Sequence, residues 1–176
     1  IIYKPHPRVA MSTVSDIASA HRKVVAAITA AQELDPEAGH QYLADGDILA
    51  LFPGVDLLIS DISSVGLDFL YSRVEAPIVL TDRRTERTEL LREAPIASAT
   101  HVIDRHSLAT VGSDVAALLG QDRFAAGRIS LRSFYFDDAA PGESTRKFHE
   151  ALLDAIASHQ AKVATRLDLT EHGIRP

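Results

Sequence analysis

The stretch from Asp56 to Phe69 constrains the fold most, because its pattern changes from strand to helix within a few residues. The run up to Ser60 is short, apolar and without helical spacing, which predicts a buried strand. Residues 61–64 read Asp-Ile-Ser-Ser and are rich in helix-capping side chains, and an apolar face begins at Val65. The sequence therefore predicts a strand that ends in a hydroxyl-rich turn and continues directly into a helix.

This turn has the outline of a phosphate site. In an open parallel sheet the carboxyl ends of the strands face the ligand crevice, and a helix that begins there offers unpaired N–H groups and a positive dipole end. Ser63 and Ser64 would add two hydroxyl groups to that end. The alternative is that both serines only cap the helix, which would stabilise it by about 1 kcal/mol, and that Asp61 only forms the turn.

The rest of the chain alternates between strand and helix patterns. The expected strands are Ile1–Tyr3, His40–Leu43, Asp56–Ser60, Ala76–Thr81 and His101–Asp104. The expected helices are Ser12–Leu34, Asp47–Phe52, Ser63–Tyr71, Thr85–Glu93, His106–Leu119 and a long helix from Glu143 through Ile156, while Pro95–Ala99 reads as loop and Asp168–Pro176 as a frayed tail. This order predicts an α/β fold, with a Rossmann-like parallel sheet, helices on both faces and a long C-terminal helix.

Composition narrows the function classes. A chain of 176 residues suits one domain, so residues 1–176 are expected to form a single nucleotide-binding unit. The net charge of −6 disfavours nucleic acid as a partner. The absence of cysteine excludes disulfides and thiolate chemistry, and no histidine spacing typical of zinc occurs, so no metal or cofactor is expected. The chain also lacks a GxSxG elbow, a Walker A loop and a GxGxxG fingerprint, which disfavours hydrolase, NTPase and dehydrogenase readings.

Two other loops carry candidate chemistry. His6 lies between Pro5 and Pro7 at the end of the first strand, where an imidazole could shuttle a proton or donate to phosphate, or could be an ordinary loop histidine. The segment from Asp137 to Arg146 leads into the first turn of the last helix. Because each loop falls at a strand end or a helix start, one crevice could collect both of them together with the serine turn.

These blocks resemble, in the same order, the C-terminal half of the CDP-glycerol glycerophosphotransferases, the teichoic-acid primases and polymerases of bacteria. Residues 4–7 (Lys-Pro-His-Pro) are similar to the family's His-Pro segment at a strand end. Residues 56–69 are similar to its most distinctive block, an apolar strand that runs into Asp-Tyr-Ser-Ser and then Asp-Phe, and Pro77-Ile78 is similar to the strand that follows. Residues 138–146 resemble, more loosely, the segment that opens the last helix.

The resemblance implies one half of a GT-B enzyme, in which two Rossmann-like domains enclose the active site. The reaction would move glycerol phosphate, or a similar polyol phosphate, from a CDP-linked donor to a lipid-linked acceptor. His6 would be catalytic, and the residues near the donor diphosphate and nucleotide would be Asp61, Ser63, Ser64, Asp138, Glu143, Ser144 and Arg146. The partner would be an N-terminal domain of the same longer chain, and the whole protein would be cytoplasmic, peripheral on the inner face of the membrane.

Two further readings stay open. Ile62 stands where the family usually has tyrosine, which leaves room for a GT-B glycosyltransferase with a UDP- or GDP-sugar donor. The other alternative is that the chain is not an enzyme. It would then be an α/β binding or scaffolding domain whose serines only cap a helix. The chain starts with the strand pattern Ile1-Ile2-Tyr3 instead of an initiator methionine, so we expect it to begin inside a larger protein.

Overall fold

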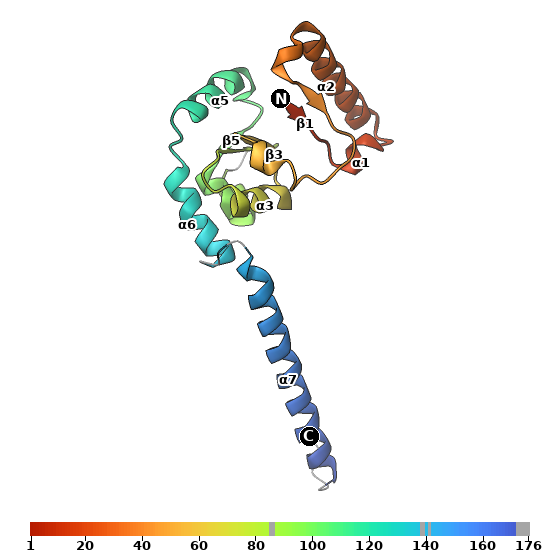
Figure 1. Cartoon of the computed structure of the whole chain (residues 1–176), viewed down its shortest axis with the longest axis vertical. Helices are drawn as coiled ribbons and strands as arrows, with labels where there is room; N and C mark the ends of the chain where they lie inside the picture. The colour runs from red at the N-terminus through yellow and green to blue at the C-terminus, as the bar shows by residue number, and fades with distance from the viewer. Residues whose placement is uncertain (85–86, 138–139, 141, 172–176) are drawn as a thin grey trace. The chain divides into compact units, whose positions relative to one another are not determined.

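The computed structural model describes residues 1–84, 87–137, 140 and 142–171, with side chains to residue 164 (Figure 1). The protein is α/β, mostly helical, with two small parallel sheets and a long C-terminal helix. By its internal contacts the chain divides into two compact units, Ile1–Gly54 and Val55–Pro176. The prediction of a single nucleotide-binding domain therefore stays a prediction, and each unit is described by itself.

The first unit is built around one long helix and two very short strands. Strand β1 (Ile2–Tyr3) pairs in parallel with β2 (Gln41–Tyr42), and α2 (Ser15–Leu34) connects them. The unit also contains α1 (Pro7–Ala10) and the 3₁₀ turns η1 (Pro36–Ala38) and η2 (Phe52–Gly54). The Tyr3 hydroxyl lies 3.1 Å from Nδ1 of His21, and the Tyr3 and Tyr42 rings stack with centroids 5.9 Å apart. An aromatic contact between sheet and helix thus holds this small unit together.

The second unit contains a three-stranded parallel sheet in the order β3-β4-β5. Strand β4 (Ile78–Thr81) is central, and its residues Ile78, Val79 and Leu80 are all buried. Continuous burial is expected for a central strand that is covered on both faces. The elements of this unit are β3 (Leu58–Asp61), α3 (Ser64–Ser72), β4, α4 (Arg87–Glu93), the 3₁₀ helix η3 (Pro95–Ala99), β5 (His101–Ile103), the 3₁₀ turn η4 (Leu108–Thr110), α5 (Val111–Gly120), α6 (Ala125–Phe136) and α7 (Glu143–Glu171).

Helices pack on both faces of this sheet. On one face Val79 clusters with Ile103 of β5 and Leu118 of α5. On the other face Cδ2 of Leu80 lies 3.7 Å from the position that a Cβ at Gly66 of α3 would take. Val79 and Leu80 are consecutive, so their side chains point to opposite sides of the pleat. The alternation along one strand therefore explains why α5 and α3 cover opposite faces.

A buried arginine joins α6 to the connection between α3 and β4. Arg128 is fully buried, and its guanidinium donates from Nε to the Val74 carbonyl at 3.0 Å and from Nη2 to the Glu75 carbonyl at 3.2 Å. The same Nη2 forms an ion pair with Asp122. One turn further along, Nε of Arg132 donates to the Tyr71 carbonyl at 3.1 Å. Two arginines of α6 thus donate hydrogen bonds to carbonyl groups in the last turn of α3 and in the connection that follows it.

The structure corrects several sequence-based boundaries. Residues 48–51 form a bend and turns followed by η2, so the helix expected at Asp47–Phe52 was wrong. The backbone N–H of Leu49 donates to the Asp47 carboxylate at 2.9 Å, an interaction that favours a turn. The helix expected from His106 begins at Val111, because Asp104 holds the N–H groups of His106 and Ser107 in a turn.

Three further expectations need correction. Strand β3 was expected to be buried, but it lies at the edge of the sheet and Ile59 is 50% exposed. The segment Pro95–Ala99, expected to be loop, is η3. Helix α7 extends to Glu171, into the segment expected to fray from Asp168. In the part of the chain that the structure describes, no helix is both long and apolar enough to cross a membrane.

Candidate functional site

The candidate site is the turn between β3 and α3, at the carboxyl end of the edge strand. Asp61 is the last residue of β3, and Ser63 is the N-cap of α3, with extended backbone angles of φ −144° and ψ 172°. Pairing in register places Asp61 beside Thr81, the last residue of β4. The Thr81 hydroxyl also donates to the Ser60 carbonyl at 3.4 Å. The turn is therefore fixed to the central strand of the sheet.

The side chain of Ser63 does not cap its own helix. It makes no capping hydrogen bond, and its Oγ instead lies 3.5 Å from Oγ of Ser60. The Ser60 hydroxyl donates to the Asp61 carboxylate at 3.4 Å. Asp61, Ser63 and Ser64 are all exposed. The simple interpretation, in which the Ser63 hydroxyl is occupied by capping, does not hold, and the start of α3 presents two exposed serines to solvent.

The charged groups beside this turn belong to the next strand. Asp82 follows β4, and its carboxylate accepts hydrogen bonds from the backbone N–H and Nε of Arg84, at 3.3 and 3.2 Å. Arg84 also forms an ion pair with Glu93 of α4. Arg83, between Asp82 and Arg84, is exposed. The strand end therefore holds one ion-paired cluster, in which two carboxylates share one guanidinium, and one solvated cation.

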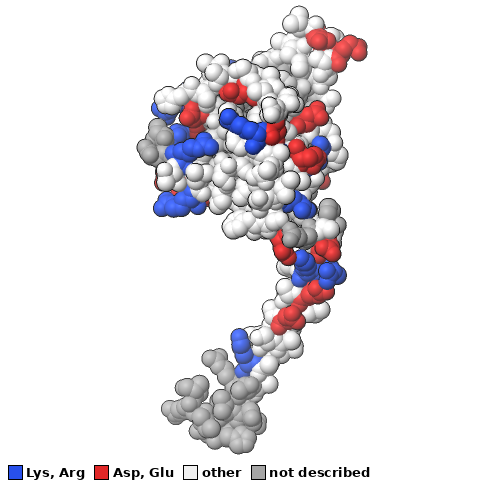
Figure 2. Space-filling view, turned by 90° about the vertical axis from the view of Figure 1, so that its left-hand side faces the viewer, with Lys and Arg blue, Asp and Glu red and all other residues white. Residues whose placement is uncertain are grey.

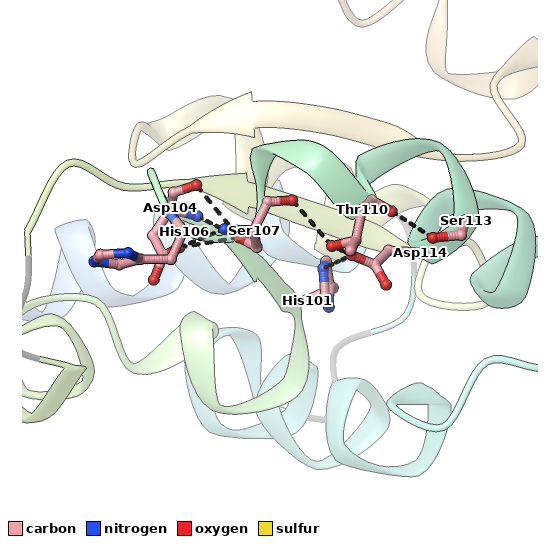
Figure 3. A network of polar contacts seen from close by, with 7 residues as sticks. All are labelled: His101, Asp104, His106, Ser107, Thr110, Ser113 and Asp114. Atoms are coloured by element: carbon pink, nitrogen blue, oxygen red, sulfur yellow. Dashed lines mark hydrogen bonds and ion pairs between the residues drawn. The ribbon is translucent and has the colours of Figure 1, made fainter.

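A polar network follows β5, the last strand of the sheet (Figure 3). Asp104 accepts hydrogen bonds from the backbone N–H groups of His106 at 2.8 Å and Ser107 at 3.0 Å, and from the Ser107 hydroxyl at 3.1 Å. Beyond it, Thr110 donates to the Asp114 carboxylate at 2.8 Å, and Nε2 of His101 lies 3.4 Å from that carboxylate. Sequence reasoning missed this network. The spacing Asp-x-x-Ser after a strand, a turn signature, could have found its first half.

The hydrogen bonds to Asp104 give a pH prediction. The N–H groups of His106 and Ser107, with the Ser107 hydroxyl, hold the pKa of the Asp104 carboxyl below its ordinary value of 3.8. A lowered folded-state pKa stabilises the fold above the unfolded pKa, and this contribution disappears as the pH falls through the folded value. The stability advantage of the wild type over Asp104→Asn should therefore shrink in acid, as measured by urea denaturation from neutral pH downward. An advantage that is constant with pH would contradict this assignment.

His6 lies in the first unit and caps α1. Its Nδ1 accepts a hydrogen bond from the backbone N–H of Arg8 at 3.1 Å, and Pro5 before it is buried. Because Nδ1 is the acceptor, the proton of the neutral ring is on Nε2, which can donate outward. The side chain is exposed. The expected sharing of a crevice between His6 and the serine turn stays a prediction.

The third expected loop is anchored at the far end of α3. The Tyr71 hydroxyl donates to the Ala140 carbonyl at 3.4 Å, and Tyr71 lies about 10 Å along the helix axis from the serine turn. Glu143 accepts from the Ala140 N–H at 3.0 Å, and Arg146 pairs with Glu150 at 2.8 Å. Ser144 is exposed, and Asp138 lies outside the described residues. A role for Glu143, Ser144 or Arg146 near a nucleotide thus stays a prediction.

Among residues 1–84, 87–137, 140 and 142–171, no group of three or more histidine or acidic side chains is placed to hold a metal ion. Beside the exposed Asp61 carboxylate, the serine turn itself offers hydroxyl groups and backbone N–H groups. Such groups bind anions and stabilise developing negative charge without a covalent intermediate. Comparison of the chain with family models, curated proteins and solved structures found no match.

Proposed function

We propose that the turn between β3 and α3 holds the diphosphate of a nucleotide-activated donor. The enzyme would be a transferase that moves glycerol phosphate, or a similar polyol phosphate, from a CDP-linked donor to a lipid-linked cell-wall acceptor. In this proposal the chain is the Rossmann-like donor half of a GT-B architecture. The other half of the active site would come from an N-terminal domain of the same longer chain, and the whole protein would work at the inner face of the membrane.

The observation that carries the proposal is the exposed, uncapped start of α3. The helix begins directly after a parallel strand, its N-cap side chain makes no capping bond, and Ser63 and Ser64 are exposed. A helix N-terminus at the carboxyl edge of a parallel sheet favours negative charge. The order of the His-Pro, Asp-x-Ser-Ser and Pro-Ile segments, which resembles the glycerophosphotransferases, supports a CDP-linked donor.

The remaining residues take distinct roles in this proposal. Asp61 is a poor phosphate ligand because its carboxylate is negative, but it can accept hydrogen bonds from hydroxyl groups of the donor. His6, with its Nε2 proton available, would donate to the transferred phosphate or to the departing group. Phosphoryl transfer of this kind depends mainly on positioning and charge stabilisation. Glu143, Ser144 and Arg146 would lie near the nucleotide.

A sugar nucleotide is the second candidate donor. Ile62, which is partly buried in the turn, replaces the tyrosine of the resembled motif, so the turn lacks an aromatic hydroxyl that a CDP-polyol donor could use. A GT-B glycosyltransferase with a UDP- or GDP-sugar would use the same diphosphate contacts. Whether the protein binds a cytidine nucleotide or a uridine or guanosine nucleotide therefore distinguishes the two candidate donors.

Nucleotide binding should raise the thermal midpoint of the protein, because a ligand that binds only the folded state stabilises it by mass action. At tenfold excess over the dissociation constant, CDP-glycerol is expected to add about 1.4 kcal/mol to the free energy of unfolding. The double variant Ser63→Ala/Ser64→Ala, which removes the hydroxyl groups but keeps the backbone N–H groups, should reduce the shift. Midpoints are measured by scanning fluorimetry with CDP, UDP, GDP and CDP-glycerol.

Ser130→Ala is the matched control, since Ser130 is an exposed helical serine on α6 that bonds only to a carbonyl of its own helix. It should keep the full nucleotide shift. A shift with UDP or GDP alone would assign a sugar-nucleotide donor. A shift of full size in the double variant would exclude this turn as the diphosphate site. No shift with any nucleotide, in this chain and in the proposed longer chain, would favour the scaffolding alternative.

A further inference from the structure

Helix α7 exposes apolar side chains along one stripe. Each residue from 148 to 164 is exposed, and Ile156 and Leu153 are 44% and 65% exposed. The apolar members of this segment that are large and exposed are Phe148, Leu152, Leu153, Ile156 and Val163. Helices in proteins gain most of their stability from packing such a face, so a stripe of this length indicates a surface that a partner covers.

Three residues of the stripe, Leu152, Ile156 and Val163, lie at the positions of a coiled-coil seam. Residues 149, 152, 156, 159 and 163 alternate in steps of three and four, which is the heptad repeat of a helix that packs against another helix. Ile156 and Val163 take the a positions, and Leu152 takes a d position. Phe148 and Leu153 flank the seam at positions g and e. β-Branched residues at a with leucine at d favour parallel two-stranded coiled coils.

The charges of α7 fit an identical partner better than a lipid surface. Between Glu143 and Ala164 the helix carries three basic and three acidic side chains, so the segment has no net charge. Figure 2 shows both signs interspersed along it. Helices that lie on anionic membranes present a basic polar face instead. In a parallel pair, Phe148 would meet Leu153 of the other copy and Ala155 would meet Gln160, so within residues 148–160 no like charges face each other across the seam.

We propose that α7 mediates self-association of the chain as a parallel, in-register two-stranded coiled coil. The seam contains Leu152, Ile156 and Val163, each opposite its own copy. His149 and His159 occupy the two remaining seam positions, and polar residues there set the register at a cost in stability. The dimer is therefore expected to dissociate on dilution. This inference is independent of the proposed transfer reaction.

The test is sedimentation velocity of the 176-residue chain over a wide range of protein concentration. The wild type should move from monomer to dimer as the concentration rises. Ile156→Lys places a charge in the seam and should lower the association constant at least tenfold. Ser158→Lys adds the same charge at a c position, away from the seam, and should associate like the wild type. Monomers at all concentrations, or equal effects of the two substitutions, would overturn the proposal.

Orientation is tested by cross-linking, because the chain contains no cysteine. In the parallel arrangement Leu152→Cys places two thiols opposite each other at a d position, so oxidised glutathione should convert the variant to a covalent dimer. Ser158→Cys is the control and should remain uncrosslinked. A dimer that Leu152→Cys fails to trap would overturn the parallel register. Binding of the wild type to anionic vesicles, with no self-association in their absence, would assign the stripe to a lipid surface and overturn the proposal.

Discussion

Replacing Arg128 with alanine is expected to lower the free energy of unfolding by about 3–5 kcal/mol, because removing one partner of a buried ion pair leaves the other without compensation. The Asp122 side chain is only 13% exposed, so its carboxylate would lose its counter-charge in a poorly solvated place. The Val74 and Glu75 carbonyls would lose their donors in the same substitution. The connection between α3 and β4 would then lose its anchor on α6.

Urea denaturation of the variants measures this effect. Arg92→Ala is the matched control, because Arg92 is 75% exposed and its carboxylate neighbours lie 3.7–3.8 Å away. That substitution should change stability by less than about 0.5 kcal/mol. Arg128→Met/Asp122→Leu should recover part of the loss, since it removes both charges while keeping apolar volume. A loss from Arg128→Ala as small as that from Arg92→Ala would show that the buried guanidinium does not hold α6 in place.

The strands of the sheet in the second unit were predictable from the sequence, but the exposure of its edge strand β3 was not. The run from Ala76 to Thr81 is continuously apolar and bounded by turn residues, which is sufficient to predict β4. The run before Ser60 has the same local pattern, yet Ile59 on β3 is half exposed. Strand order decides this difference, and strand order depends on pairing between distant residues, which a local pattern does not contain.

The burial of Arg128 also could not be predicted from the local sequence pattern. Arg123 and Arg128 lie within six residues of each other, and nothing in their neighbours distinguishes an exposed side chain from a fully buried one. The difference comes from carbonyl groups more than fifty residues earlier in the chain. At the serine turn, the position of Ser63 as an N-cap was predictable from residue type. The contact of its hydroxyl with Ser60, in place of a capping bond, was not.

Two glycines in helices should respond to alanine with opposite signs. A Cβ at Gly127 of α6 would lie 2.9 Å from the Cβ of Ala99 in η3, and that atom is fixed to the backbone, so no rotamer change can relieve the contact. Gly127→Ala is expected to destabilise the fold by about 1–3 kcal/mol through overpacking, despite a helix-propensity gain of up to about 1 kcal/mol. At Gly66 of α3 the nearest atoms, Ile96 Cδ1 and Leu80 Cδ2, lie 3.7 Å away, an ordinary contact. Gly66→Ala should therefore stabilise the fold by about 0.5–1 kcal/mol.

The measurement is the urea midpoint of each variant, with the double variant Gly127→Ala/Ala99→Gly as the decisive comparison. If the close approach of α6 to η3 causes the loss, removing the methyl group of Ala99 should relieve it, and the double variant should be more stable than the sum of the single effects predicts. Equal stabilisation by Gly66→Ala and Gly127→Ala would mean that α6 can move away from η3 at little cost. In that case Arg128 would also hold its carbonyl partners less firmly, because it lies next to Gly127 on the same helix. The arginine and glycine substitutions therefore test the packing of α6 against two neighbours, the connection after α3 and η3.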